Sequence, residues 1–245
     1  MRLFLSESGN AKGLQVVLLH AFPMSGEMWK PQLEALKDFR VLVPDLRGFG
    51  GTPLEAPWLV EHAAADMLET VTGPFVAVGL SMGGYVALQL AATAPERVKG
   101  LVLCDTRAEP DANENKAKRA AAIDFVRKNG VEAFLGPFLK DAVANPKSLD
   151  FLKGVASKSK PEAVMAALAA LAARPDAVPN LPKIKCPTAV LVGSQDKITP
   201  LPLSETMRSK IPGAELHLIP DAGHFSNAEN PVVFNERLVS FLKRL

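Results

Sequence analysis

Short apolar runs alternate with longer segments of helical period along most of this chain, and this alternation limits its fold more than any other feature. The runs are rich in β-branched residues and almost continuously apolar, as expected for parallel strands covered on both faces. They cover residues 15–19, 40–44, 75–79, 98–104, 188–192 and 215–219. Helices are predicted between them at residues 26–37, 59–70, 82–94, 201–210 and 231–245. The pattern predicts an α/β protein with a doubly wound, mostly parallel sheet.

The alternation stops between Thr106 and Leu181, where Ala- and Lys-rich segments of helical period replace the strands. So long a stretch is not a simple connection, because loops in such units usually have about 2–6 residues. We therefore expect a helical cap at residues 106–181, inserted in a core made of residues 1–105 and 182–245. Prolines predict several short helices rather than one long one. They are Pro110, Pro137, Pro146, Pro161, Pro175, Pro179 and Pro182.

The overall composition fits one domain and excludes several classes of protein. The chain has 245 residues, of which 48% are hydrophobic and 22% charged. A net charge of +2, spread along the chain, argues against a nucleic-acid partner. No run approaches the roughly 18 apolar residues of a membrane span. The N-terminus turns polar too early for a secretory signal, so a cytoplasmic location is expected.

The two cysteines are predicted to be reduced thiols. Cys104 ends one predicted strand, whereas Cys186 precedes the next. If those strands are parallel neighbours, about six residues at ~3.3 Å each separate the two sulfurs along the sheet. That separation is far beyond the reach of a disulfide.

The segment Gly79-Leu80-Ser81-Met82-Gly83-Gly84 lies between a predicted strand and a predicted helix. In this context G-x-S-x-G is typical of a strained turn that lifts a serine hydroxyl above the sheet, with small residues preventing collisions. The alternative is a glycine-rich turn that binds phosphate at a helix N-terminus. The segment lacks the lysine of a P-loop and the spacing of a dinucleotide fingerprint. We therefore predict that Ser81 is a nucleophile.

A serine nucleophile needs a histidine base oriented by a carboxylate, usually in the chain order Ser, acid, His. Asp196 follows the predicted strand at 188–192, and His224 follows the strand at 215–219. Both positions lie where open α/β sheets place their active sites. Asp105, which also ends a strand, is the rival acid. Asp221 lies too close to His224 in the sequence and is expected to shape its turn.

The other three histidines are less suitable as the base. His62 lies on a predicted helix and His217 inside a predicted strand, so both are expected to be structural. His20 belongs to the segment His20-Ala21-Phe22-Pro23, which follows the first predicted strand. Acyl chemistry needs two backbone donors for the developing oxyanion. We assign them to the amides of Met82 and Phe22.

These segments, together with residues 45–52 (Asp-Leu-Arg-Gly-Phe-Gly-Gly-Thr), resemble the α/β-hydrolase superfamily over nearly the whole chain. Within it the chain is similar to small carboxylesterases, non-haem haloperoxidase-like perhydrolases and 3-oxoadipate enol-lactonases. There are two departures from the family pattern. Ala21 stands where the family usually has glycine. The short N-terminus, with only Leu3 to Leu5 before the strand at Gln15, suggests that the first antiparallel strand of the family's sheet is missing.

The cap is expected to cover the substrate pocket. Its candidate lining residues are Phe125, Phe134, Phe138, Met165 and Leu168. A cap with few fixed charges suits a neutral ester. Arg107, in a segment similar to enol-lactonase sequences, is a candidate partner for a substrate carboxylate.

The sequence therefore predicts a serine hydrolase of small or medium apolar carboxylic esters, with an acyl-enzyme on Ser81. An enol-lactonase or a perhydrolase with the same triad is the alternative, and a non-catalytic receptor for a small ligand is another. Cleavage of epoxides or carbon–halogen bonds, for which related folds use aspartate at this position, is disfavoured by Ser81. No metal-ligand spacing is present, so no metal or other cofactor is expected. The expected partner is a small-molecule ester or lactone.

Overall fold

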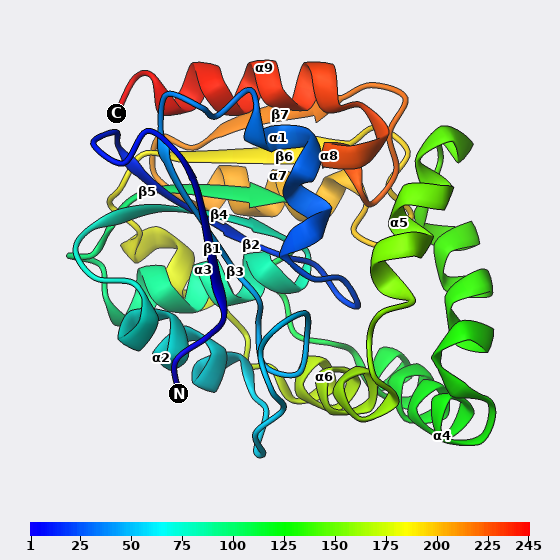
Figure 1. Ribbon diagram of the computed structural model, residues 1–245. Coiled ribbons are helices and arrows are strands. Elements are labelled where there is room, and N and C mark those ends of the chain that lie inside the picture. Colours follow the sequence, from blue (N-terminus) through cyan, green and yellow to red (C-terminus); the bar gives the residue numbers. More distant parts are fainter.

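A seven-stranded sheet forms the centre of the computed structural model, which describes residues 1–245 (Figure 1). The strand order is β1-β3-β2-β4-β5-β6-β7, and all neighbours except β1 and β3 are parallel. All six predicted strands are present. They are β2 (Gln15–Leu19), β3 (Arg40–Pro44), β4 (Phe75–Leu80), β5 (Val98–Cys104), β6 (Thr188–Gly193) and β7 (Glu215–Ile219).

Helices cover both faces of the sheet, as a doubly wound fold requires. In Figure 1, α1 and α9 lie over one face, and α2 and α3 lie over the other. The predicted helices are present with small shifts of their ends. They are η1 (Gly26–Trp29), α1 (Lys30–Leu33), α2 (Val60–Thr70), α3 (Met82–Thr93), α7 (Leu201–Lys210) and α9 (Pro231–Leu242), with the short α8 (Ser226–Glu229) in addition. Because the chain moves from β2 outward to β3 and then back to β4, the direction of winding reverses between β2 and β4. This is the point at which open α/β sheets bind their ligands.

The expectation that the antiparallel strand is missing at the N-terminus was wrong. Strand β1 (Leu5–Gly9) pairs antiparallel with β3, from Leu5 opposite Pro44 to Gly9 opposite Arg40. Its residues are exposed or half-buried, because an edge strand has only one neighbour and packs little of its surface. It therefore lacks the apolar run from which the other strands were predicted.

The segment between β5 and β6 contains only helices, as predicted. They are α4 (Asn113–Ala142), η2 (Pro146–Ser148), α5 (Leu149–Ala156), α6 (Pro161–Ala173) and η3 (Val178–Lys183). Helix α4 is longer than the prolines suggested, but it kinks at Gly130, where φ is 80°. In Figure 1 helices α4, α5 and α6 lie together to one side of the sheet. The division of the chain into a core and a separate cap domain stays a prediction; we call this segment the helical insertion.

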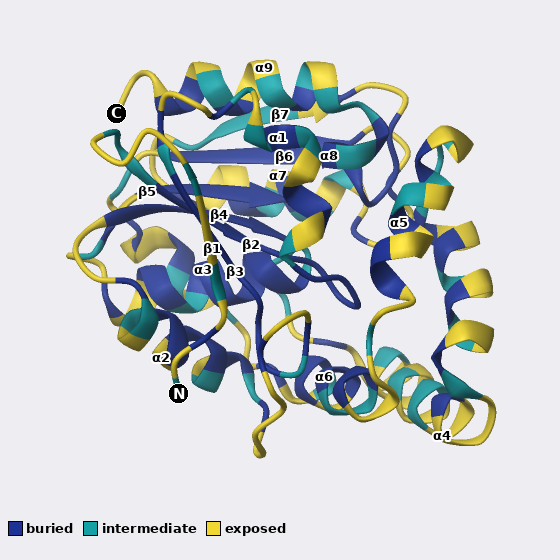
Figure 2. Ribbon diagram, in the orientation of Figure 1, coloured by how far each residue is buried: buried dark blue, intermediate teal, exposed yellow.

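One apolar cluster joins the sheet to the helical insertion. It contains 69 buried residues, including strand residues such as Val78 and insertion residues such as Leu135 and Leu139. Figure 2 shows the central strands buried, whereas the outer faces of α4 and α5 are exposed. The insertion therefore packs against the rest of the fold through buried apolar side chains. Every helix here is too short or too polar to cross a membrane.

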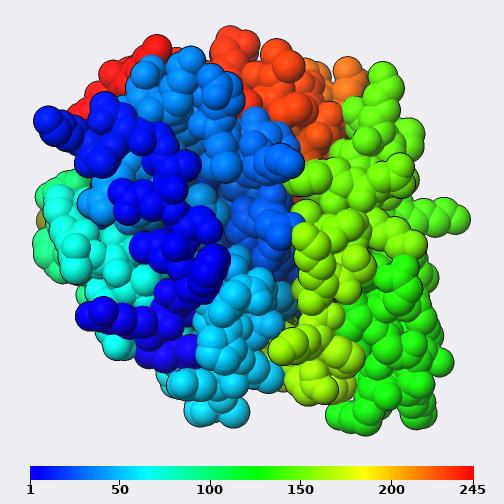
Figure 3. Space-filling view, viewed as in Figure 1, coloured from blue at the N-terminus to red at the C-terminus, as the bar shows by residue number.

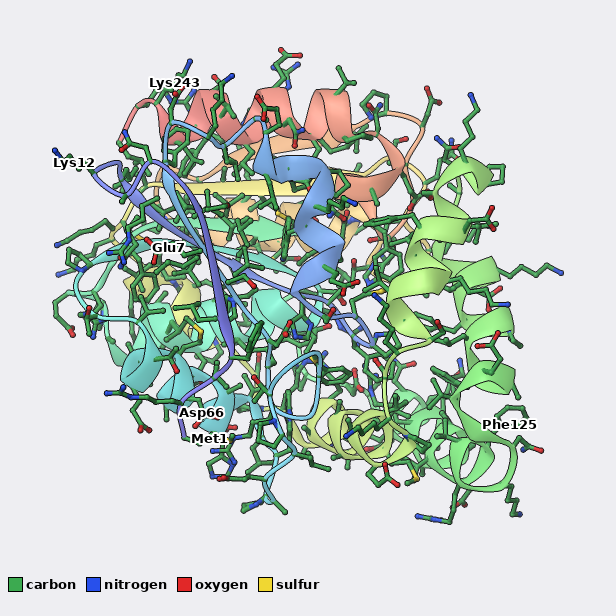
Figure 4. The ribbon with its side chains drawn as sticks, in the orientation of Figure 1. Met1, Glu7, Lys12, Asp66, Phe125 and Lys243 are labelled. Atoms are coloured by element: carbon green, nitrogen blue, oxygen red, sulfur yellow. The ribbon has the colours of Figure 1, made fainter.

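The loop at residues 45–52 is fixed beside β3 by hydrogen bonds and an ion pair. The Asp45 carboxylate accepts hydrogen bonds from the amides of Gly26, at 2.7 Å, and Gly51, at 2.8 Å. Arg47 pairs with Asp66, which also binds the N-terminal amine of Met1 at 2.7 Å (Figure 4). The loop at residues 45–52 thus has structural partners of its own.

The two cysteines lie on neighbouring strands but at different levels. Cys104 pairs in register with Leu191, five residues beyond Cys186 along the chain. Both thiols are free. The prediction of two unbridged cysteines is confirmed.

Candidate active site

Ser81 occupies a sharp turn between β4 and α3. Its φ of 51° lies in the left-handed region, which non-glycine residues rarely adopt. The turn is possible because glycines lie on both sides. A Cβ on Gly79 would come within 2.3 Å of the Gly83 carbonyl oxygen, and one on Gly83 within 2.1 Å of the Leu19 carbonyl oxygen. This close packing holds the Ser81 hydroxyl above the end of the sheet.

His224 lies between Ser81 and Asp196. Its Nε2 is 2.9 Å from the Ser81 Oγ, and its Nδ1 is 2.9 Å from Asp196 Oδ2. The His224 amide donates to the Ala142 carbonyl at 2.8 Å, so the end of α4 also holds this loop. Since an ionised carboxylate only accepts, Nδ1 carries the proton and Nε2 is left to accept from the serine hydroxyl.

Each oxygen of the Asp196 carboxylate accepts two hydrogen bonds. Oδ1 accepts from the amides of Ile198 and Thr199, at 2.8 and 2.9 Å, and Oδ2 accepts from the Thr199 hydroxyl at 2.6 Å. Burial alone would raise the pKa of Asp196, but the charge and hydrogen bond of His224 and the Thr199 bonds lower it to about 2. Burial also acts to lower the pKa of His224, yet Asp196 outweighs it and the pKa is raised above 6.5. Asp196 is therefore ionised at neutral pH and stabilises a protonated His224.

Asp105, the rival acid, has other partners. Its Oδ1 accepts from the Gly193 amide at 2.8 Å, and its Oδ2 accepts from the Ser226 amide and hydroxyl at 3.1 and 2.5 Å. It makes no hydrogen bond to His224. Burial, followed by the charge of Asp196, raises the pKa of Asp105 to about 8. Asp105 thus ties the loops after β6 and β7 together.

Two backbone amides near Ser81 have no acceptor within the chain: those of Met82 and Phe22. The first begins α3, and the second lies in the loop after β2. His20 fixes that loop, because its Nδ1 donates to the Ala21 carbonyl and its Nε2 accepts from the Leu46 amide, both at 2.9 Å. Burial lowers the pKa of His20, which keeps the ring neutral. Ala21 replaces the usual glycine without strain, since its φ is not positive.

The two remaining histidines lie elsewhere. His62 is on α2, and His217 is on β7, 3.1 Å from the Glu215 carboxylate. Neither lines the cavity at Ser81. No group of three or more His, Cys, Asp or Glu side chains is arranged to hold a metal ion.

A cavity of about 60 Å³ lies over Ser81 and His224. This is several times the volume that a single bound water needs. Of the residues proposed to contact substrate, Phe138 and Arg107 line it. The walls also contain five residues that the sequence did not identify, namely Tyr85, Arg119, Leu171, Ile198 and Thr199. The expectation of few fixed charges is wrong for these walls, because they hold two guanidinium groups.

The other proposed contacts lie outside these walls. Phe134 stacks on Phe138, with ring centroids 5.6 Å apart, and so supports the wall from behind. Leu168 is 3% exposed within the apolar cluster, and Met165 packs against that cluster. Phe125 was proposed wrongly, because it is 44% exposed on the outer side of α4 (Figure 4). A helix turns by about 100° per residue, so Phe125 faces solvent while its neighbour Val126 is buried.

A much larger groove, of about 1030 Å³, lies between the N-terminal edge of the sheet and α5. Phe4, Glu27 and Lys30 line one side, and Phe151 and Lys158 line the other. In Figure 3 it follows the boundary between the blue N-terminal segment and the green insertion. It contains neither Ser81 nor His224. The larger groove is therefore separate from the hydrogen-bonded pair of Ser81 and His224.

Comparison with known proteins agrees with this fold. Residues 16–237 match the model of the alpha/beta hydrolase family. The chain is 34% identical to the pimeloyl-acyl-carrier-protein methyl ester esterase of Methylococcus capsulatus, over 91% of this chain and 92% of the relative. Among solved structures it is similar to a thermophilic esterase from Thermogutta terrifontis in a malate-bound form. That match has 38% identity and a TM-score of 0.92, and it covers 99% of this chain and 93% of the other.

A second solved structure carries a different activity. The enol-lactonase of Burkholderia xenovorans is 28% identical, with a TM-score of 0.90 over 98% of this chain and 96% of that one. These relatives share hydrolysis but differ in their named substrates. The family match over most of the length, joined to the sheet order and the turn at Ser81, shows that this chain belongs to the alpha/beta hydrolase family and is a hydrolase.

Proposed function

We propose that this protein is a serine hydrolase that cleaves carboxylic esters of small substrates through an acyl-enzyme on Ser81. The observation that supports this most directly is the unbroken hydrogen-bonded chain from the Ser81 hydroxyl through His224 to Asp196. An isolated serine hydroxyl is a weak nucleophile, and this chain supplies both the base and the group that orients it.

In the first half of the reaction, His224 Nε2 takes the proton of the Ser81 hydroxyl as Oγ attacks the ester carbonyl carbon. The carbonyl oxygen becomes an oxyanion, and the amides of Phe22 and Met82 donate to it. Protonated His224 then gives its proton to the leaving alkoxide, which departs as the alcohol.

In the second half, a water molecule gives a proton to His224 and attacks the acyl-enzyme. The same two amides stabilise the second oxyanion. The carboxylic acid leaves as Ser81 regains its proton from His224. Asp196 stays ionised throughout, since its pKa is about 2, and stabilises the imidazolium in both halves.

A lactonase is the second candidate. The same steps open a ring instead of releasing a separate alcohol. The position of Arg107 in the wall beside Ser81 favours this candidate, because a guanidinium there suits a substrate that carries a carboxylate. A perhydrolase would share the acyl-enzyme and admit peroxide in place of water.

The test is the turnover of p-nitrophenyl acetate and butyrate, together with a panel of alkyl esters and lactones, by wild type and Ser81→Ala. We expect Ser81→Ala to lose turnover by a factor of about 10⁵ to 10⁶ while keeping its melting temperature. Ser209→Ala, an exposed serine on α7, is the matched control and should retain full activity. Undiminished turnover in Ser81→Ala would contradict the mechanism, and no wild-type turnover across the panel would favour a small-ligand receptor.

A further inference from the structure

Three arginines converge on one buried carboxylate beside the Ser81 cavity. Asp111, whose side chain has no exposed surface, pairs with Arg107, Arg119 and Arg174. These arginines come from the loop after β5, from α4 and from the end of α6. Burial alone would raise the pKa of Asp111, but Arg119 and Arg174 lower it, so this carboxylate is ionised. Three guanidinium groups thus share one carboxylate as their ion-pair partner.

Arg174 has a full set of structural partners. It donates to Asp111 and to the Leu171 carbonyl, both at 2.9 Å, and to the Glu109 carbonyl at 2.8 Å. Its guanidinium also lies 4.2 Å from the centre of the Tyr85 ring. Glu109 accepts through its backbone carbonyl, and its Oε2 is buried without a hydrogen-bond partner. Arg174 therefore holds the end of α6 to the loop after β5.

Arg107 and Arg119, unlike Arg174, have few structural partners. Each makes a single hydrogen bond, to one oxygen of Asp111, and no other bond to the protein. A guanidinium has five N–H donors, so most of theirs have no partner in the chain. The Arg107 Nε is buried without an acceptor. Both side chains are largely buried, at 14% and 21% exposed.

Both of these arginines line the same cavity as Ser81 and His224. Burying a guanidinium whose N–H donors lack acceptors costs free energy, unless an anion accepts from those donors and neutralises the charge. Asp111 orients the two guanidinium groups and cannot neutralise both, because it already pairs with Arg174. The pair is thus set to bind an anion that enters the cavity.

We propose that Arg107 and Arg119 form a carboxylate subsite, and that the preferred substrates are short esters or lactones that carry a second carboxylate away from the reacting carbonyl. This inference rests on the proposed function, because it assigns the substrate class of the same cavity. A carboxylate is the smallest common anion that offers two oxygens to the free donors of these guanidinium groups. Its two oxygens match the planar fork of an arginine.

The experiment compares monomethyl glutarate with methyl valerate, which replaces the free carboxylate by a methyl group on the same five-carbon acyl chain. For wild type we expect kcat/KM to be about tenfold or more higher for monomethyl glutarate, mainly through a lower KM. In Arg119→Gln and Arg107→Gln this ratio should fall toward one. Arg127→Gln, an exposed arginine on α4 that pairs with Asp124, is the control and should keep the wild-type ratio.

A binding measurement separates this proposal from the proposed function. Calorimetry with glutarate and Ser81→Ala protein should detect binding that the Arg119→Gln substitution weakens by about tenfold, whether or not esters are hydrolysed. The subsite is contradicted if methyl valerate is the better wild-type substrate, if both Gln variants keep the wild-type ratio, or if inorganic phosphate binds more tightly than glutarate. Hydrolysis that survives in Ser81→Ala contradicts the proposed function instead, and leaves the calorimetry to decide on the subsite.

Discussion

The two sides of the Ser81 cavity are built in different ways. On the sheet side, Ser81, His224 and Asp196 each follow a strand and are held by buried hydrogen bonds. The turn at Ser81 is also flanked by glycines at positions where a Cβ atom would collide with the backbone. On the insertion side, Arg119 and Phe138 project from α4, with unused donors and an aromatic face. The sheet side holds Ser81, His224 and Asp196 at fixed distances, whereas the insertion side sets the size and charge of the space. We infer that chemistry and selectivity come from different regions of the molecule.

The largest effect is expected at the two carboxyl groups on the sheet side, Asp196 and Asp105. Asp196→Asn should reduce kcat by about 10⁴-fold, because an amide no longer stabilises the imidazolium or selects the correct tautomer. Asp105→Asn should change kcat far less, since Asp105 makes no hydrogen bond to His224. Stopped assays at saturating p-nitrophenyl butyrate measure both.

Asp105→Asn is expected to affect the stability of the fold more than its activity. Above pH 8, where Asp105 is ionised and its partners donate to it, an amide at position 105 would place an NH₂ group opposite the amide of Gly193 or Ser226, so we expect a loss of about 1–3 kcal/mol in the free energy of unfolding. Urea titration of Asp105→Asn against wild type gives this value. A loss of activity in folded Asp105→Asn equal to that in Asp196→Asn would mean that Asp105 is the acid.

The pH dependence tests the sheet side alone. Ser81 needs an unprotonated His224, and the pKa of that histidine is raised above 6.5, chiefly by Asp196 acting against burial. As pH falls through this raised pKa, His224 becomes protonated, so kcat/KM should fall about tenfold per pH unit below it. Activity should therefore reach its plateau on the alkaline side of neutrality. A pH profile with p-nitrophenyl acetate measures the position of this limb, and full activity at pH 5.5 would contradict the assignment of His224 as the base.

The smallest effect belongs to the insertion side. Phe138 lies edge-on to Phe22 and Phe225, with ring centroids 5.9 and 6.4 Å away. Phe138→Ala removes one wall of the cavity, so kcat/KM for octanoate relative to acetate esters should rise by about tenfold. Phe125→Ala, on the exposed side of the same helix, should leave this ratio unchanged. An unchanged ratio in Phe138→Ala would show that the insertion does not set acyl-chain length.

Much of the sheet side could be predicted because it depends on local pattern. Each buried strand is an apolar run, and the carboxyl ends of parallel strands meet at one edge. Ser81, Asp196 and His224 could therefore be grouped from their positions after three strands. Strand β1 was missed for the converse reason, since an edge strand with exposed side chains has no apolar run.

The insertion side could not be predicted in the same way. Helical period indicates which residues of a helix are apolar, but it does not indicate where that helix packs. Arg119 is one charged residue among many on α4, and only the packing of α4 beside Asp111 places it in the cavity wall. Phe125 was chosen as an aromatic residue, although it falls on the outer face of the helix.

The most direct test of Ser81 as the nucleophile is covalent labelling of the native protein with a fluorophosphonate, followed by peptide mass spectrometry. We expect one adduct, on Ser81, which forms more slowly as His224 becomes protonated and is absent in His224→Ala. Stoichiometric labelling at another serine, or no labelling of a folded protein that still hydrolyses esters, would show that Ser81 is not the nucleophile.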